Sequence, residues 1–152
     1  MRKPVWLRVA QTLGMLWTSP NTVIGIVAGL AGMLLGANVH WQRRECALIF
    51  CRMPYFRVAR VAAAALTLGN VILCTGDILD VSCHTYAHRA GYGAELPILL
   101  ADHERAHVYQ YMALGPLFLP LYFLCGGISA RNRFERAADR YAQSGRGWWP
   151  WS

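Results

Sequence analysis

Charged residues are scarce in this chain. Asp, Glu, Lys and Arg make up 15% of its 152 residues, against 55% hydrophobic residues, whereas ordinary soluble domains carry about 25% charged residues. This length allows one domain, or one small domain with an anchor. We therefore expect the apolar surplus to lie in a lipid bilayer.

Acidic residues are the scarcer charged class, with 8 Asp and Glu against 15 Lys and Arg and a net charge of +7. The arginines are scattered beside apolar stretches and do not gather on one polar helix, as they do in many nucleic-acid-binding domains. We therefore expect no nucleic acid partner. Attraction to anionic lipid headgroups is the simpler use of this positive charge.

Paired cysteines are missing as well. The chain has five cysteines, an odd number, and no Cys-x-x-Cys pair. This pattern gives no support to a zinc ribbon and argues against a disulfide scaffold. Several of the five lie in apolar runs, where cysteine acts as a small hydrophobic residue. They are Cys46, Cys51, Cys74, Cys83 and Cys125.

Charge is absent altogether between Val9 and Gln42. The 19 residues from Asn21 to Val39 predict a transmembrane helix, preceded by an interfacial segment, so that residues 1–44 form an uncleaved membrane anchor. Four glycines of this stretch share one helix face, where another helix can approach closely. They indicate either a homo-oligomer contact or a packing seam within the chain: Gly25, Gly29, Gly32 and Gly36.

Residues 45–147 are expected to form the folded domain, with a tryptophan-rich tail at 148–152. Branched and aromatic residues predict strands at 46–51 and 68–73, which we expect to form a small antiparallel sheet. The tail indicates an interfacial anchor, a cap on the core or a binding site for a partner.

The sequence His-Glu-Arg-Ala-His at residues 103–107 carries the most specific chemical signal. We expect a helix over residues 95–114, which places His103 and His107 on one face. Two imidazoles at this spacing can bind one zinc ion, while Glu104 lies beside the metal to take a proton from its water. The pattern therefore predicts zinc-dependent hydrolase chemistry.

A second charged segment, residues 132–141, is expected to be helical and carries two carboxylates that could complete a metal site, Glu135 and Asp139. Together, His-Glu-x-x-His and the later Glu-x-x-x-Asp resemble the gluzincin group of zinc metallopeptidases. The resemblance implies that His103, His107 and Glu135 are the zinc ligands and that Glu104 is the general base. Asp139 would accept the far N–H of a ligating imidazole and fix its tautomer.

The last third of the chain is also similar to a family of short, uncharacterised bacterial membrane proteins with a metallopeptidase-like motif. The likeness covers segments at 103–111, 115–122 and 132–135, and it is weaker at 19–22 and 68–72. It implies an α+β fold with a helical zincin-like core in a bacterial inner membrane. More basic residues follow the apolar span than precede it, which places the C-terminal domain on the cytoplasmic side. Those before the span are Arg2, Lys3 and Arg8, and those after it are Arg43, Arg44, Arg52, Arg57 and Arg60.

These features predict a membrane-anchored zinc metallopeptidase that acts on peptide bonds near the bilayer. An edge strand of the sheet would pair with an extended peptide substrate. Two alternatives stay open, an inactive zinc-bound membrane scaffold and a structural membrane protein without metal. Arg105 departs from the zincin pattern, in which the two positions between the histidine pair are usually uncharged. A cation one residue from the base would disfavour zinc binding if it pointed inward.

Two further segments bear on the site. His84 and His88 are also four residues apart and offer a rival metal pair, with or without Cys83, although no glutamate lies between them as a base. The alternative is an ordinary loop or helix end, where these histidines face water or make hydrogen bonds.

Residues 116–128 are too short to span a bilayer, and a full crossing would carry Glu135 about 30 Å from His107. If Glu135 is a ligand, this segment must therefore fold back or lie along the membrane, with Gly126-Gly127 as a turn.

Overall fold

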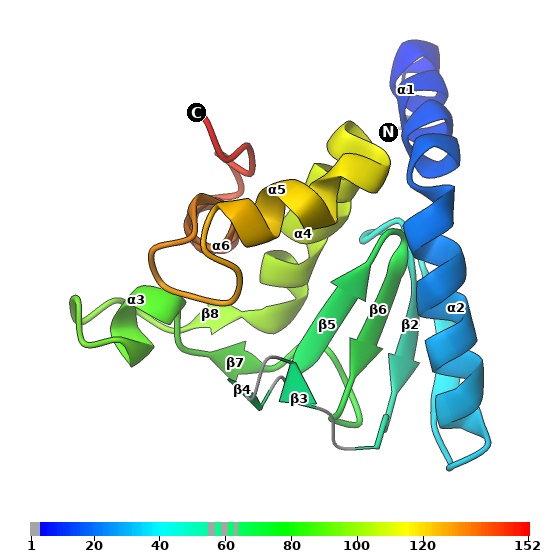
Figure 1. Cartoon of the computed structure of the whole chain (residues 1–152), viewed down its shortest axis with the longest axis horizontal. Coiled ribbons are helices and arrows are strands. Elements are labelled where there is room, and N and C mark those ends of the chain that lie inside the picture. Colours follow the sequence, from blue (N-terminus) through cyan, green and yellow to red (C-terminus); the bar gives the residue numbers. More distant parts are fainter. Residues whose placement is uncertain (1–3, 55–56, 59–60, 63) are drawn as a thin grey trace.

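The chain folds into an α+β structure, as the sequence predicts. The computed structural model describes residues 4–54, 57–58, 61–62 and 64–152, and Figure 1 shows a small sheet with α2 on one face and α4 on the other. The elements are α1 (Val5–Trp17), α2 (Ser19–Met33), β1 (Asn38–Gln42), β2 (Ala47–Cys51), β3 (Arg57–Val58), β4 (Val61–Ala62), β5 (Ala65–Leu68), β6 (Val71–Cys74), β7 (Ser82–Cys83), α3 (Tyr86–Arg89), β8 (Ile98–Leu99), α4 (Leu100–Leu114), the 3-10 helix η1 (Gly115–Leu117), α5 (Phe118–Leu124) and α6 (Arg133–Ser144).

The main sheet is mixed, so the prediction of an antiparallel sheet is wrong. Its strand order is β1-β2-β6-β5, and β2 runs parallel to β6 while the two outer pairs are antiparallel. The reason lies in residues 68–73, which are not one strand but the end of β5, a hairpin turn and most of β6. Because the chain reverses direction in this turn, β6 runs antiparallel to β5 and parallel to β2. Gly69 in this turn has a φ of +63°, and any side chain there would collide with Thr22 of α2.

The helix predicted over Asn21–Val39 is shorter than expected. It runs from Ser19 to Met33, and the chain then turns into β1 at Asn38. No single helix of the described residues is long and apolar enough to cross a bilayer, while α1 and α2 together meet both criteria with a 68° bend between them. Arg2, Lys3 and Arg60, which entered the topology prediction, lie outside the described residues.

The glycine face of α2 packs against the rest of the chain. At three positions an added Cβ would lie less than 3 Å from a neighbouring side chain: Gly25 from Val71, Gly29 from Phe50, and Gly32 from Met53. Gly36 lies beyond the helix end, with open space around it. Of the two alternatives, the structure therefore supports a packing seam within the chain.

Helix α4 begins at Leu100, five residues later than predicted, because residues 98–99 pair with β7 instead.

The segment between α4 and α6 folds back rather than continuing in one direction. After α5, Gly126 and Gly127 both have positive φ values and reverse the chain. The side chain of buried Asn132 then caps α6 and donates to the carbonyls of Tyr122 and Gly127. Helix α6 consequently packs along α4 and returns toward the histidines.

Candidate metal centre

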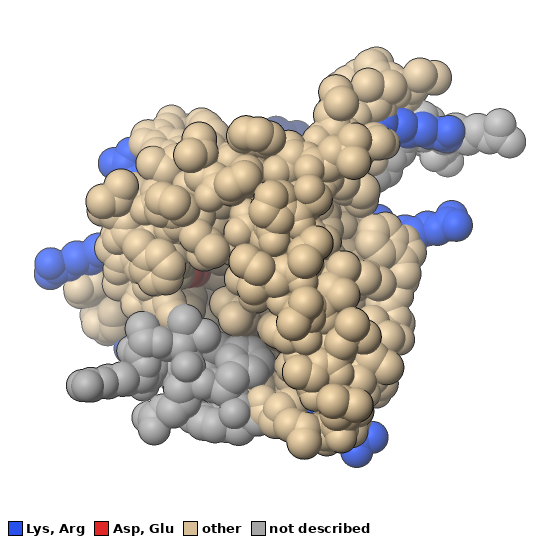
Figure 2. Space-filling model, turned by 45° about the vertical axis from the view of Figure 1, so that its right-hand side comes forward, with Lys and Arg blue, Asp and Glu red and all other residues tan. Residues whose placement is uncertain are grey.

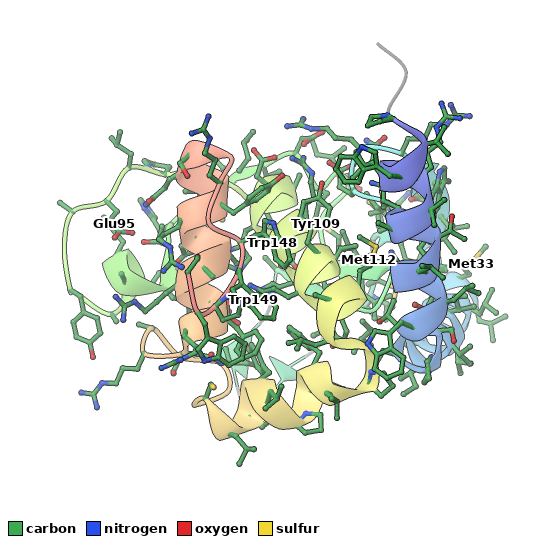
Figure 3. All side chains as sticks on the ribbon, turned by 90° about the horizontal axis from the view of Figure 1, so that it is seen from above. Met33, Glu95, Tyr109, Met112, Trp148 and Trp149 are labelled. Atoms are coloured by element: carbon green, nitrogen blue, oxygen red, sulfur yellow. The ribbon has the colours of Figure 1, made fainter. Side chains whose placement is uncertain are left out.

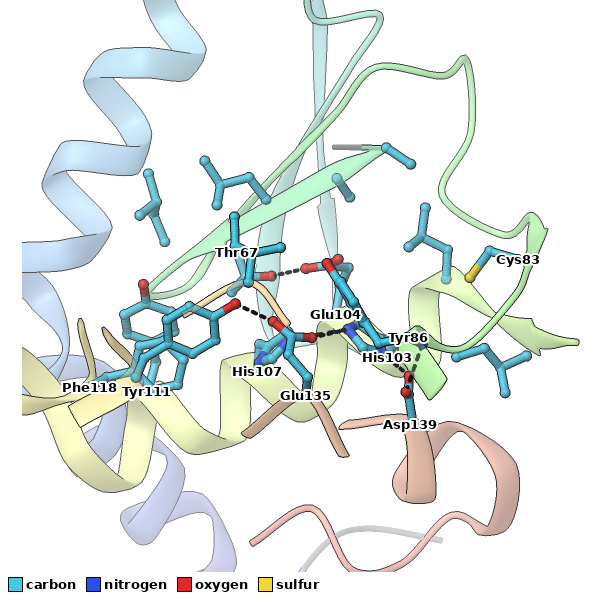
Figure 4. A pocket seen from close by; sticks show the side chains of 18 of the residues that line it. Thr67, Cys83, Tyr86, His103, Glu104, His107, Tyr111, Phe118, Glu135 and Asp139 are labelled. Carbon is cyan, nitrogen blue, oxygen red and sulfur yellow. Dashed lines mark hydrogen bonds and ion pairs between the residues drawn. The ribbon is translucent and has the colours of Figure 1, made fainter. Parts of the chain in front are cut away.

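Three predicted ligands converge on one point between α4 and α6. His103 and His107 come from α4 and Glu135 from the first turn of α6, and all three are buried. The Nε2 atoms of the two histidines lie 3.2 Å apart, and Glu135 Oε2 lies 3.1 Å from His103 Nε2 and 3.3 Å from His107 Nε2. Figure 4 shows the three side chains pointing toward one another at the bottom of a pocket.

These separations fit a metal ion. A tetrahedral zinc ion with bonds of about 2.0 to 2.1 Å requires ligand atoms about 3.3 Å apart. The three observed distances, from 3.1 to 3.3 Å, match this spacing. The buried group of His103, His107 and Glu135 can therefore hold a metal ion.

Each ligand is oriented by a further side chain. Asp139 Oδ1 lies 2.9 Å from His103 Nδ1, as the sequence predicts. Gln110 Oε1 lies 2.8 Å from His107 Nδ1, and the hydroxyl of Tyr122 donates to Glu135 Oε1. Both Nδ1–H groups are thus used by the protein, which leaves both Nε2 atoms to face the centre.

The electrostatics of the three ligands show what a metal must displace. Burial alone lowers the pKa of His103, but its hydrogen bonds to Asp139 and Glu135 outweigh burial and hold that pKa well above the usual 6.5. Burial raises the pKa of Glu135, but the charge of His107 and the hydrogen bonds to both histidines hold it well below the usual 4.5. Without metal the cluster therefore shares a proton, and an incoming cation competes with that proton.

The predicted base lies in the same pocket, a cavity of about 300 Å³ lined by His103, Glu104, His107 and Glu135. Glu104 is buried, and its Oε2 accepts a hydrogen bond of 2.6 Å from the hydroxyl of Thr67 on β5. Figure 4 shows this bond on the side of the pocket formed by the sheet. The carboxylate is therefore held beside the ligands but is not one of them.

Tyr86, at the start of α3, also lines this pocket. Its backbone N–H donates to Asp139 Oδ2 at 3.1 Å, and its ring lies 6.0 Å from that of His103. Burial and the nearby carboxylates of Glu135 and Glu104 raise the pKa of the phenol. The hydroxyl consequently stays protonated and can donate a hydrogen bond inside the pocket.

Arg105 does not line the pocket. Its guanidinium Nη2 contacts Glu45 Oε1 at 2.8 Å and Asp102 Oδ1 at 2.7 Å, and Arg105 and Glu45 are both buried. The cation is thus neutralised by two carboxylates away from the ligands. Its departure from the zincin pattern serves a buried ion cluster between α4 and the segment before β2.

The rival histidine pair does not form a second centre. The rings of His84 and His88 stack at 4.1 Å, and His84 lines the pocket mouth together with Cys83. Within the described part of the chain, His103, His107 and Glu135 form the only group of three potential metal ligands. Cys83 and His84 therefore border the pocket, and His88 stacks on His84 outside its lining.

Four contributing residues carried no assigned role in the sequence analysis: Thr67, Tyr86, Gln110 and Tyr122. Gln110 has a usable signal, because a position three residues after His107 shares its helix face. The other three come from distant segments with no spacing rule.

The C-terminal tail also contributes to the site. The carbonyl of Trp148 accepts a hydrogen bond from the Gln110 amide, and the ring of Trp148 packs on Tyr109 (Figure 3).

The tail itself is packed against the helices. The rings of Trp149 and Trp151 lie 5.2 Å apart, and Trp151 also contacts Phe134 at a centroid distance of 5.4 Å. Of the three alternatives from the sequence, the cap on the core is the one these contacts support.

Comparisons with protein-family models, curated proteins and solved structures found no significant match for this chain. The resemblance to gluzincins and to short bacterial membrane proteins therefore stays a prediction from the sequence motifs.

Proposed function

We propose that this protein is a membrane-anchored, zinc-dependent hydrolase that cleaves peptide bonds. The observation that carries this proposal is the convergence of His103, His107 and Glu135 in one pocket with the buried carboxylate of Glu104. Two histidines and one carboxylate, with another carboxylate beside them, are the donor set of catalytic zinc sites that retain an open position. A purely structural site would use a fourth protein ligand instead.

Each residue of the pocket has a separate role in the proposed peptide hydrolysis. Zinc held there would polarise a peptide carbonyl and lower the pKa of bound water to about 7. Glu104 takes the proton of the attacking water and returns it to the leaving amine. Tyr86, as a neutral phenol, donates a hydrogen bond to the oxygen on which negative charge develops. Thr67 holds the Glu104 carboxylate in position until the proton is transferred.

Strand β5 is suited to bind the substrate backbone. It lies at the end of the main sheet, where β6 is its one neighbouring strand among the described residues, and its residues from Ala65 to Leu68 line the pocket. An extended peptide can add to such an edge through main-chain hydrogen bonds. The peptide would then run past Glu104, which is held by the same strand through Thr67.

The proposal is tested by incubating zinc-loaded protein in detergent with a library of fluorescence-quenched peptides. We expect cleavage that a chelator abolishes and added zinc restores. His103→Ala should be inactive, and Tyr86→Phe should lower kcat by about 10-fold or more with little change in KM, because the lost hydrogen bond forms in the transition state.

A zinc-bound protein that cleaves no peptide in this library would contradict the proposal and favour the inactive scaffold. A protein that cleaves peptides equally well with and without the chelator would point to a different catalytic centre. In either case, the metal content of the same samples separates loss of metal from loss of chemistry.

A further inference from the structure

Helix α5 and the 3-10 helix η1 before it expose apolar residues beside the pocket. Leu117 of η1 and Phe123 and Leu124 of α5 are 56%, 56% and 83% exposed, and residues 112–130 contain no charged residue. Phe123 also lines the cavity that holds the ligands. An exposed helix in water normally has a polar outer face, and this one has none.

The exposed face of α5 continues onto the N-terminal helices. The 3-10 helix η1, directly before α5, is joined to the bend between α1 and α2. There the Asn21 amide donates to the Gly115 carbonyl at 3.0 Å, and Trp17 covers Gly115. From that bend, α1 and α2 present further exposed apolar side chains, including Leu13, Leu16, Val23, Val27 and Leu30. Apolar side chains are thus exposed on all three helices, which meet near this bend, and we call these side chains together the apolar face. Soluble monomers rarely expose contiguous apolar patches of more than a few hundred Å².

The space-filling view shows how little charge this side of the molecule carries. Figure 2 shows a face almost free of charge, with an acidic atom visible in a hollow and basic side chains at its margins. Apolar surface with basic residues around it complements the apolar interior and anionic headgroups of a bilayer. A second copy of this chain would carry the same net charge of +7, so the two copies would repel each other.

We propose that the apolar face of α1, α2 and α5 lies in the bilayer, so that the pocket opens at the lipid and admits an apolar peptide segment held in the membrane. The cavity matches this substrate, because apolar side chains of β5 and α5 line its walls: Leu66, Leu68, Phe118, Leu119 and Phe123. The position of this face in the bilayer, called its seat below, does not depend on any catalytic activity, whereas the substrate class rests on the proposed hydrolase function.

The seat is tested by photocrosslinking of the full chain in vesicles of phosphatidylethanolamine and phosphatidylglycerol. Benzoylphenylalanine replaces Leu124 in α5 or Leu117 at the end of η1, and Leu96 in the loop before β8 is the matched control. Leu96 is 82% exposed, close to the 83% of Leu124, but the neighbouring Glu95 lies on the opposite side of the molecule from α1 and α2 (Figure 3).

We expect lipid adducts at positions 117 and 124 and none at position 96. Equal labelling at all three positions, or crosslinks from position 124 to a second protein chain, would overturn the seat in the bilayer. Because none of these positions belongs to the metal centre, the result does not depend on catalysis.

The substrate class is tested with two peptides that share one apolar extended segment. One peptide also carries a spanning stretch of about 20 leucine and alanine residues, and the other does not. We expect the vesicle-bound enzyme to cleave the membrane-held peptide at least 10-fold faster. Preference for the free peptide would overturn the inference while leaving the hydrolase intact, whereas cleavage of neither peptide would contradict the hydrolase itself.

Discussion

Glu104→Gln is expected to lower kcat/KM for peptide cleavage by about 10² to 10⁴-fold, because the amide cannot take a proton from water. The change keeps the shape of the side chain, and its amide can still pair with the Thr67 hydroxyl that now binds Glu104 Oε2 at 2.6 Å. The three ligand side chains are unaltered, so the variant should bind as much zinc as the wild type. The measurement is steady-state cleavage of a quenched peptide together with metal analysis of the same samples.

A matched control makes this loss specific. Glu95→Gln applies the same chemical change to an exposed glutamate outside the pocket that holds the metal ligands, and its activity should equal that of the wild type. A Glu104→Gln protein that keeps its zinc and more than about a tenth of its activity would show that another group is the base.

Arg105→Met should destabilise the fold by about 3 to 5 kcal/mol, because it leaves the carboxylate of Glu45 buried without its main partner. Arg105 and Glu45 are 6% and 2% exposed, and their charged atoms lie 2.8 Å apart. The substitution lies next to the base in sequence but outside the pocket. Urea unfolding in detergent, followed by circular dichroism, measures the loss.

Two variants identify the cause. Arg44→Met removes a cation from the same cluster, but the Arg44 side chain is 59% exposed, so it should cost less than about 1 kcal/mol. Adding Glu45→Gln to Arg105→Met should recover part of the stability, because the buried charge is then gone. A double variant that is as unstable as the sum of its single variants would contradict this account.

The cluster that can hold a metal ion was predictable in part because helix geometry is regular. Residues four apart on a helix share a face, which applies to His103 and His107 and again to Glu135 and Asp139. The role of Glu104 came from the His-Glu-x-x-His motif, and the choice of Glu135 came from the resemblance to gluzincins. The structure places Asp139 on His103, as predicted. Thr67, Tyr86 and Tyr122 reach the site through contacts between segments far apart in sequence, for which no periodic signal exists.

The sheet was less predictable, for a related reason. The apolar pattern at 68–73 indicated extended structure, but strand direction depends on Gly69, whose positive φ permits a tight reversal. Likewise, the uncharged run after Asn21 predicts one long helix, whereas the chain leaves the helix at Met33 and adds β1 to the sheet. The pairing of strands that are distant in sequence decided both outcomes, and the hydropathy pattern alone does not predict which strands pair.

The most direct test of the central claim is the metal content per chain of detergent-purified protein, measured by elemental analysis of all first-row transition metals. The account predicts about one zinc per chain in the wild type and in Glu104→Gln, and almost none in His103→Ala or Glu135→Ala, since a site with two remaining ligands binds zinc weakly. A wild-type protein that stays free of zinc when zinc is supplied would contradict the account. So would zinc retained at about one ion per chain in both His103→Ala and Glu135→Ala.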